Sequence, residues 1–445
     1  MELRIQVWGN NMIPQSNFLI LVEIKSERLQ ALRLILAQMT SKPGFADPHN
    51  SRVPFGRLKR LHVARFTILE ANTADDIRRH GVEPAPWQPS LAFLGDCDGP
   101  AEEMLSELVD IAEPGLREIF SHCTGYSEHQ ALLQWMLKHN RKPSANYINW
   151  VGRSVLQVHE EAALQRSLSA KLQVLLLIRA GEVDIRRIRQ QLLTHVELEL
   201  DAGNLTLTPP LPTPFGWKLR NSLHKFGVPL VLLMLSPLLL ISAPLLIVLL
   251  RWHENRDPEI TLRPEREHIR RLTEQEDHDV SNHFNVFGDV KPGLFRLGLL
   301  KFLLLVLDYS ARHIYNHGYL TRIRTIHFAR WVLLDNNRRI LFASNYDGSQ
   351  ESYMDDFINK VAWGLNLVFS NGVAYPSTRW LVKGGAEREH FYKYTLRRHQ
   401  LPSEVWYKAY PGLTAYDLSR NSRIRAGVDE YPENDEEIRA WLRLL

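Results

Sequence analysis

The chain contains one strand-like segment twice. RLHVARFTIL begins at Arg60, and TIHFARWVLL begins at Thr325. The aligned polar residues of the two segments are His62 with His327 and Arg65 with Arg330. Further along, Asp98-Gly99 of the first copy aligns with Asp347-Gly348 of the second. The two halves of the chain are therefore expected to share one arrangement of strands and helices.

Each copy predicts the same order of secondary-structure elements. A short β run, a segment with helical periodicity, two strands rich in β-branched and aromatic residues, a helix and a final strand follow one another. This βαββαβ order is the ferredoxin-like pattern, in which helices cover one face of a sheet. Two such units bury their remaining apolar faces by packing together. We therefore predict an α+β fold in which two ferredoxin-like repeats form an intramolecular dimeric α+β barrel.

The predicted domain boundaries follow from this repeat. The first ferredoxin-like repeat covers residues 18–170, and the second covers residues 283–428. A linker, residues 171–282, joins the repeats and contains a hydrophobic membrane segment. Residues 429–445 are predicted to form an acidic C-terminal tail with a short helix.

That hydrophobic segment runs from Val228 to Leu250 without a charged residue. Crossing a bilayer takes about 20 apolar residues, so we expect a membrane-associated protein that contacts lipid through residues 228–250. A single crossing would separate the two repeats, and three prolines interrupt the segment. Basic residues flank both ends, which favours a shallow membrane hairpin and a largely cytoplasmic chain. A buried core helix, or a second crossing by residues 294–307, are the alternatives.

The totals argue against one class of partner and indicate a compartment. A net charge of +4 over 445 residues gives no reason to expect a nucleic-acid partner. The two cysteines, Cys97 and Cys123, are too few for a disulfide framework and are typical of a reducing compartment.

The aligned histidines, arginines and aspartates are the candidate catalytic residues. They are His62, Arg65 and Asp98 in the first copy, and His327, Arg330 and Asp347 in the second. A turn near Asn337 places His327 about opposite Asp347, whereas strand alternation separates His327 from Arg330 unless a bulge intervenes. The alternative to a catalytic role is a structural one. In that case the aspartates cap the helices that follow them, and the histidines and arginines specify the fold.

The sequence Gly95-Asp96-Cys97-Asp98-Gly99, at a strand-to-helix turn, resembles the GxxDG motif of the dye-decolorising peroxidases, which share the dimeric α+β barrel architecture. The second copy has Ser344 in place of the first glycine. The resemblance implies haem as the cofactor, Asp98 as the acid–base carboxylate beside an arginine, and an iron-binding histidine that matches no particular histidine here. Stretches such as HFARW and VWYKAYPGLT also resemble an uncharacterised bacterial family.

Two hypotheses for the function follow. In the first, the barrel cavity binds haem for peroxidase-like chemistry, or a small hydrophobic or redox ligand, beside the membrane. In the second, the protein is a non-catalytic membrane-surface scaffold or lipid-binding module. Three weaker clusters are possible metal or anion sites, and each has a plainer interpretation as a solvated or structural segment: residues 276–285, His313 with His317, and residues 383–391.

Overall fold

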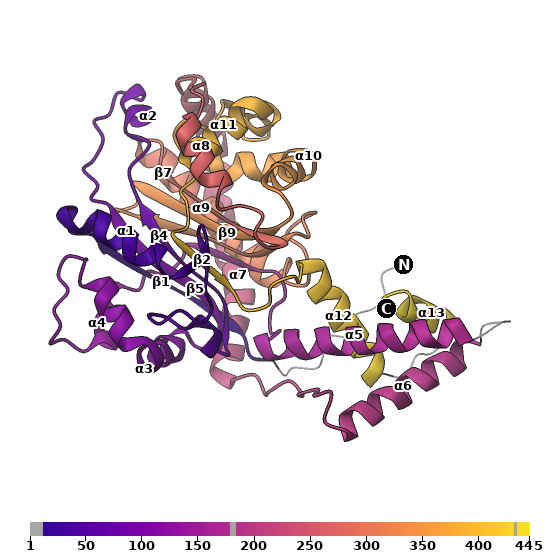
Figure 1. Cartoon of the computed structure of the whole chain (residues 1–445). Coiled ribbons are helices and arrows are strands. Elements are labelled where there is room, and N and C mark those ends of the chain that lie inside the picture. The colour runs from indigo at the N-terminus through magenta and orange to yellow at the C-terminus, as the bar shows by residue number, and fades with distance from the viewer. Residues whose placement is uncertain (1–11, 179–183, 431–433) are drawn as a thin grey trace.

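Two β-sheets form the centre of the protein, and helices cover the outer face of each sheet (Figure 1). The computed structural model describes residues 12–178, 184–430 and 434–445. The fold is α+β, as the sequence predicts. A group of helices extends away from the sheets, at the right of Figure 1.

The first sheet has six strands. Its order is β1 (Gln15–Glu23), β5 (Ser90–Asp98), β4 (Leu61–Leu69), β12 (Val405–Lys408), β3 (Phe45–Ala46) and β2 (Thr40–Lys42). Neighbouring strands pair antiparallel, except β12 and β3, which are parallel. Every residue of β4 and β5 is buried, because both faces of this sheet are covered. This explains why the two strands read as nearly continuous apolar runs.

The second sheet has four antiparallel strands. Its order is β6 (Ala145–Ile148), β8 (Ile326–Leu334), β9 (Arg339–Asp347) and β7 (Ser281–Asp289). Strand β6 comes from the first half of the chain but pairs with β8, and β12 comes from the second half but pairs with β4. The orders β1-β5-β4-β12 and β7-β9-β8-β6 therefore correspond, and each half supplies one strand to the sheet of the other.

The two sheets face each other across an apolar core. This core consists of Leu19, Leu69, Ala92, Leu94, Phe287, Val332, Leu334, Leu341, Ala343 and Leu401. The outer helices are α1 (Leu29–Ala37), α3 (Ala101–Phe120) and α4 (Leu132–His139) on the first sheet, and α9 (Leu294–His313), α10 (Gln350–Phe369) and α11 (Glu389–His399) on the second. The prediction of a barrel is wrong for the described residues, because the edge strands β1 and β6 do not pair and the two sheets stay separate.

Four helices form an arm beside the sheets. They are α5 (Val155–Ile178), α6 (Ile185–Asp201), α12 (Ala415–Asp429) and α13 (Asp435–Leu442), and they share a small apolar core around Leu164, Leu168, Leu192 and Trp441. The remaining elements connect the larger ones: α2 (Ala74–Arg79), α8 (Arg266–Thr273), β10 (Thr378–Arg379), β11 (Lys383–Gly384) and short 3₁₀ turns at Ser26–Arg28, Phe55–Arg57 and Gly385–Glu387.

The hydrophobic segment lies within one long helix, α7 (Phe215–Glu254). The predicted hairpin is wrong, since the helix continues through Pro229, Pro237 and Pro244. Residues 228–250 contain no glycine, asparagine or aspartate, the residues that most readily adopt the positive φ values of a tight reversing turn. Within the described residues, α7 is the one helix long and apolar enough to cross a membrane.

Candidate functional site

The predicted histidine and aspartate of the first copy bond to each other. His62 Nε2 lies 2.9 Å from Asp98 Oδ1, and both side chains are buried. The other carboxylate oxygen, Oδ2, accepts a hydrogen bond of 2.8 Å from the amide of Val155, the first residue of α5. The second ring nitrogen of His62 lies 3.2 Å from the hydroxyl of Tyr410. Both carboxylate oxygens of Asp98 and both ring nitrogens of His62 therefore have hydrogen-bond partners within the protein.

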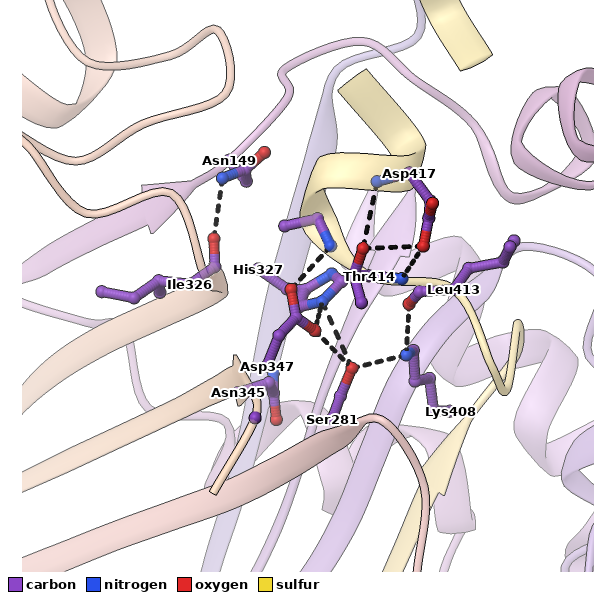
Figure 2. Close-up of polar contacts among 12 residues, drawn as sticks. Asn149, Ser281, Ile326, His327, Asn345, Asp347, Lys408, Leu413, Thr414 and Asp417 are labelled. Atoms are coloured by element: carbon purple, nitrogen blue, oxygen red, sulfur yellow. Dashed lines mark hydrogen bonds and ion pairs between the residues drawn. The ribbon is translucent and has the colours of Figure 1, made fainter. Parts of the chain in front are cut away.

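The second copy repeats this arrangement with additional partners (Figure 2). His327 Nε2 lies 2.6 Å from Asp347 Oδ1, and Asp347 Oδ2 accepts a 2.7 Å hydrogen bond from the amide of Ala415, the first residue of α12. Ser281 Oγ donates to Asp347 Oδ1 at 2.6 Å, and Lys408 Nζ donates to Ser281 Oγ at 2.6 Å. The cluster thus joins β7, β8, β9, β12 and the start of α12.

The charges of this cluster balance each other in a buried setting. Burial alone would raise the pKa of the Asp347 carboxyl. His327, Ser281 and the Ala415 amide lower this pKa by more than burial raises it, so that it ends below the ordinary value. Burial lowers the pKa of Lys408 against the opposing effect of Asp279 and Asp347. A buried carboxylate with these partners stays ionised at neutral pH and holds its neighbours in place.

Each histidine is the extra residue of a β-bulge. Between Leu61 and Val63, β4 advances two residues while β5 advances one, and β8 does the same between Ile326 and Phe328. A bulge re-aims the side chain that it carries, here toward the aspartate at the end of the neighbouring strand. Strict alternation alone would have left the histidine and the arginine on opposite faces of the strand, and the sequence itself carries no local signal for the bulge.

The two aspartates cap helices, but not the helices that follow them in sequence. The residue before α3 is Pro100 and the residue before α10 is Ser349, whereas Asp98 and Asp347 accept from the first amides of α5 and α12. A carboxylate at a helix N-terminus satisfies an amide that lacks an intrahelical partner and favours the helix dipole. Each His–Asp pair therefore fixes the arm to a sheet.

The predicted arginines reach from each sheet into the other. Arg65 Nη1 donates to Asn285 Oδ1 at 2.8 Å, and its Nη2 donates to the carbonyl oxygen of Ser344 at 3.1 Å and to Asn345 Oδ1. Arg330 Nη1 donates to the carbonyl oxygen of Phe18 at 2.8 Å, and its Nη2 donates to that of Gly95 at 3.1 Å. Both arginines are almost completely buried and are far from solvent.

Within the part of the chain that the structure describes, one carboxylate accompanies the two buried arginines. Asp96 Oδ2 lies 2.5 Å from Arg330 Nη2. Burial, and then the charge of Arg330, lower the pKa of Arg65 to about 9. Asp96 aligns with Asn345, so the repeat marks it as a further partner beyond the six predicted residues. Tyr410, Ser281 and Lys408 were also missed, because no local pattern marks them.

The predicted histidines and aspartates are bonded to other protein groups. The carboxylate of Asp98 and both ring nitrogens of His62 already have protein partners, and His327 Nε2 faces Asp347. Ser281 and His327 bond to the same oxygen of Asp347, so this Ser–His–Asp group is not in the order of a nucleophilic triad. Within the described ranges, no group of three histidine, cysteine, aspartate or glutamate side chains is placed to hold a metal ion.

A second feature of the structure is the helix α7, whose apolar side chains are exposed to solvent. Near its start, the Tyr309 hydroxyl of α9 donates to the Lys225 carbonyl oxygen at 3.1 Å, and His224 lies 2.9 Å from His313 of α9. At its end, the buried Glu254 carboxylate accepts from Thr378 Oγ1 and from the Leu381 amide, both at 2.9 Å. Both ends of the apolar helix are thus bonded to the same body.

Between these two attachments the helix is uncovered. Met234, Leu240 and Ile241 are 73%, 73% and 80% exposed. Further exposed apolar residues of α7 are Leu230, Val231, Leu233, Leu238, Leu245 and Val248. A contiguous exposed apolar surface of this size is typical of a site that contacts a membrane or another protein.

Comparison with known proteins adds no relative. No protein-family model, no curated protein and no solved structure matches the chain.

Proposed function

We propose that the protein is a non-catalytic, lipid-binding module of a membrane surface, with α7 embedded in one leaflet and parallel to the membrane plane. The observation that carries this proposal is that α7 is bonded to one body at both ends and exposes apolar side chains between them. A helix held at both ends by the same body does not need to cross the membrane to bury its apolar surface in it.

The energy of this contact is large. Moving an exposed leucine-sized side chain out of water contributes about 1.5–3 kcal/mol, so the exposed residues of α7 together favour the membrane by more than roughly 10 kcal/mol. Phe302, Leu305 and Val306 of α9, which α7 contacts, are also exposed and add to the same apolar surface. The basic residues that flank the apolar segment favour a leaflet with anionic headgroups. They are Lys218, Arg220, Lys225, Arg251 and Arg256.

We further propose that the body is a duplicated ferredoxin-like unit whose last strands are exchanged, an opened form of the dimeric α+β barrel. The corresponding strand orders support this, as do the histidine on a bulge, the arginine that crosses to the other sheet, and the aspartate that caps a helix of the arm in each half. In this interpretation the duplicated polar residues hold the fold together. The haem-dependent alternative lacks comparable support, and we expect purified protein to have no Soret absorption.

Flotation with lipid vesicles tests the membrane function. Full-length protein is expected to float with vesicles, and a Leu240→Lys/Ile241→Lys variant is expected to lose at least about tenfold in partition, because each lysine replaces an apolar side chain that enters the leaflet. A matched control, Leu198→Lys/Leu200→Lys, changes two exposed leucines of α6 and should float like the wild type. Equal flotation of both variants, or no flotation of the wild type, would contradict the proposal.

A further inference from the structure

A large cavity lies where the two sheets fail to close. It has a volume of about 700 Å³, which is within the range of small-molecule sites. Gln15 and Asn17 of the β1 edge line one side, and Asn146 and Ile148 of the β6 edge line another. Residues of the helical arm, of the end of α9 and of the start of α7 complete the wall. We name this space the edge cavity.

The edge cavity has an excess of positive charge. Lys142, Lys225 and Arg423 line it, and within the described residues none of the three forms an ion pair with a carboxylate. The two carboxylates that α5 contributes are already engaged: Glu160 accepts from the Thr208 amide and hydroxyl, each at 2.7 Å, and Glu161 from Arg153 at 2.7 Å.

Two buried polar atoms of the lining have no partner in the described structure. They are Nε of Arg153, a donor, and Oδ1 of Asn146, an acceptor. The Arg153 side chain is only 9% exposed. A buried donor or acceptor without a partner is costly, so the wall of the cavity at Arg153 and Asn146 is not fully satisfied by the protein itself.

Apolar and aromatic residues also line the cavity, and one of them belongs to α7. Trp150, Trp217, Ile438 and Trp441 contribute to its lining. Trp217, Asn221 and Lys225 lie four residues apart on α7 and line the cavity together, immediately before the apolar segment begins at Val228. Tryptophan and lysine at such positions are typical of the boundary between lipid and water.

We infer that the edge cavity binds an anionic amphiphile, with its phosphate or carboxylate at Lys142, Lys225 and Arg423 and its apolar chain against the tryptophans beside α7. The choice of an amphiphile rests on the proposed membrane-surface function, because the start of α7, the helix proposed to enter the leaflet, lines the cavity. Burial raises the pKa of Glu161 to about 7, which further reduces negative charge in this wall at neutral pH.

Calorimetric titration of the full-length protein in detergent tests this inference. The probe is a short-chain phosphatidic acid below its critical micelle concentration, with short-chain phosphatidylcholine and inorganic phosphate as comparisons. We expect phosphatidic acid to bind at least about tenfold more tightly than either comparison. A Lys142→Gln/Arg423→Gln variant should bind it at least about tenfold more weakly, since each cation contributes a charge-assisted hydrogen bond.

A matched double variant controls for general charge. Lys42→Gln/Arg79→Gln removes two exposed positive charges outside the cavity and should bind like the wild type. If Lys142→Gln/Arg423→Gln does not fold, Lys142→Gln alone, at an exposed position, provides the comparison. Equal binding of phosphatidylcholine, equal binding of inorganic phosphate, or equal losses in the two double variants would overturn the inference. Because the probe is soluble, this result is independent of flotation, which tests α7.

Discussion

Arg65 and Arg330 cross between the two sheets in opposite directions, and each ends on carbonyl oxygens of the sheet that it does not belong to. Only one carboxylate, Asp96, contacts this pair closely in the described structure. The sheets are therefore joined by directed hydrogen bonds as well as by the apolar core, and breaking one of these links should be expensive.

Replacing Arg330 by methionine should lower the free energy of unfolding by about 3–5 kcal/mol, because Asp96 is left buried without its cation. In Arg330→Met/Asp96→Asn, part of this loss should be recovered, since the carboxylate that had lost its cation is removed as well and Arg65 no longer faces the charge of Arg330. Chemical denaturation followed by circular dichroism measures both values. The exposed Arg338→Met, whose side chain is 55% exposed, should cost no more than about 1 kcal/mol. Similar losses in the two single variants would contradict this account.

Asp347→Asn should destabilise the protein by about 1–3 kcal/mol at neutral pH, because the carboxylate holds His327, Ser281 and α12. The pKa of Asp347 is lowered in the folded protein, so its contribution is present above the unfolded pKa of about 3.9 and is lost as the pH falls through the folded value. Thermal melts should therefore converge for wild type and variant in acid. The control is Asp75→Asn, at an 81% exposed side chain. A constant difference at every pH would contradict the prediction.

Glu161→Gln should change how stability depends on pH. Burial raises the pKa of Glu161 to about 7 against the effects of Arg153 and Arg425, while Glu160 and Asp429 raise it slightly more. The folded protein thus keeps a proton that the unfolded chain releases above about pH 4.3, and stability falls as the pH rises toward about 7. Relative to wild type, the variant should gain on the order of 2 kcal/mol between about pH 5 and 8. Thermal unfolding of both proteins, measured at several pH values, checks this. A difference in stability between wild type and variant that does not change between about pH 4 and 8 would contradict the prediction.

Neither cysteine should react in the folded protein. Cys97 and Cys123 are free and buried, and burial raises the pKa of each thiol to about 12, so almost no thiolate exists at neutral pH. Mass spectrometry should detect alkylation by iodoacetamide only after denaturant is added. A cysteine introduced at the exposed Ser41 should be alkylated at once and serves as the control. Rapid alkylation of either native cysteine would contradict this prediction and would mean that the structure around it opens readily.

The hairpin of β8 and β9 was predictable, whereas its bulge was not. Asn336 and Asn337 adopt positive φ values of 51° and 67°, which asparagine tolerates. The residue types at the turn are therefore enough to predict it. The extra residue at His327 leaves no comparable local signal, because a bulge changes pairing without changing composition.

Long-range partners explain the other differences. The β-branched and aromatic residues of 378–384 favour a strand, but Trp380 and Leu381 take positive φ, and their amides bond to Glu254 at the end of α7. The apolar character of residues 228–250 was clear from sequence, but their continuous helical path was not. The exchange of β6 and β12 was also missed, because alternation along a strand identifies its buried face and not its neighbour.

The exchange of strands affects how the chain matures on the ribosome. Until Val405–Lys408 have been synthesised, β4 has an unpaired, apolar edge, and the first half cannot complete its own sheet. Nascent chains that stop before this point should stick to one another or to chaperones rather than fold, and separately expressed halves should be soluble only when they are made together.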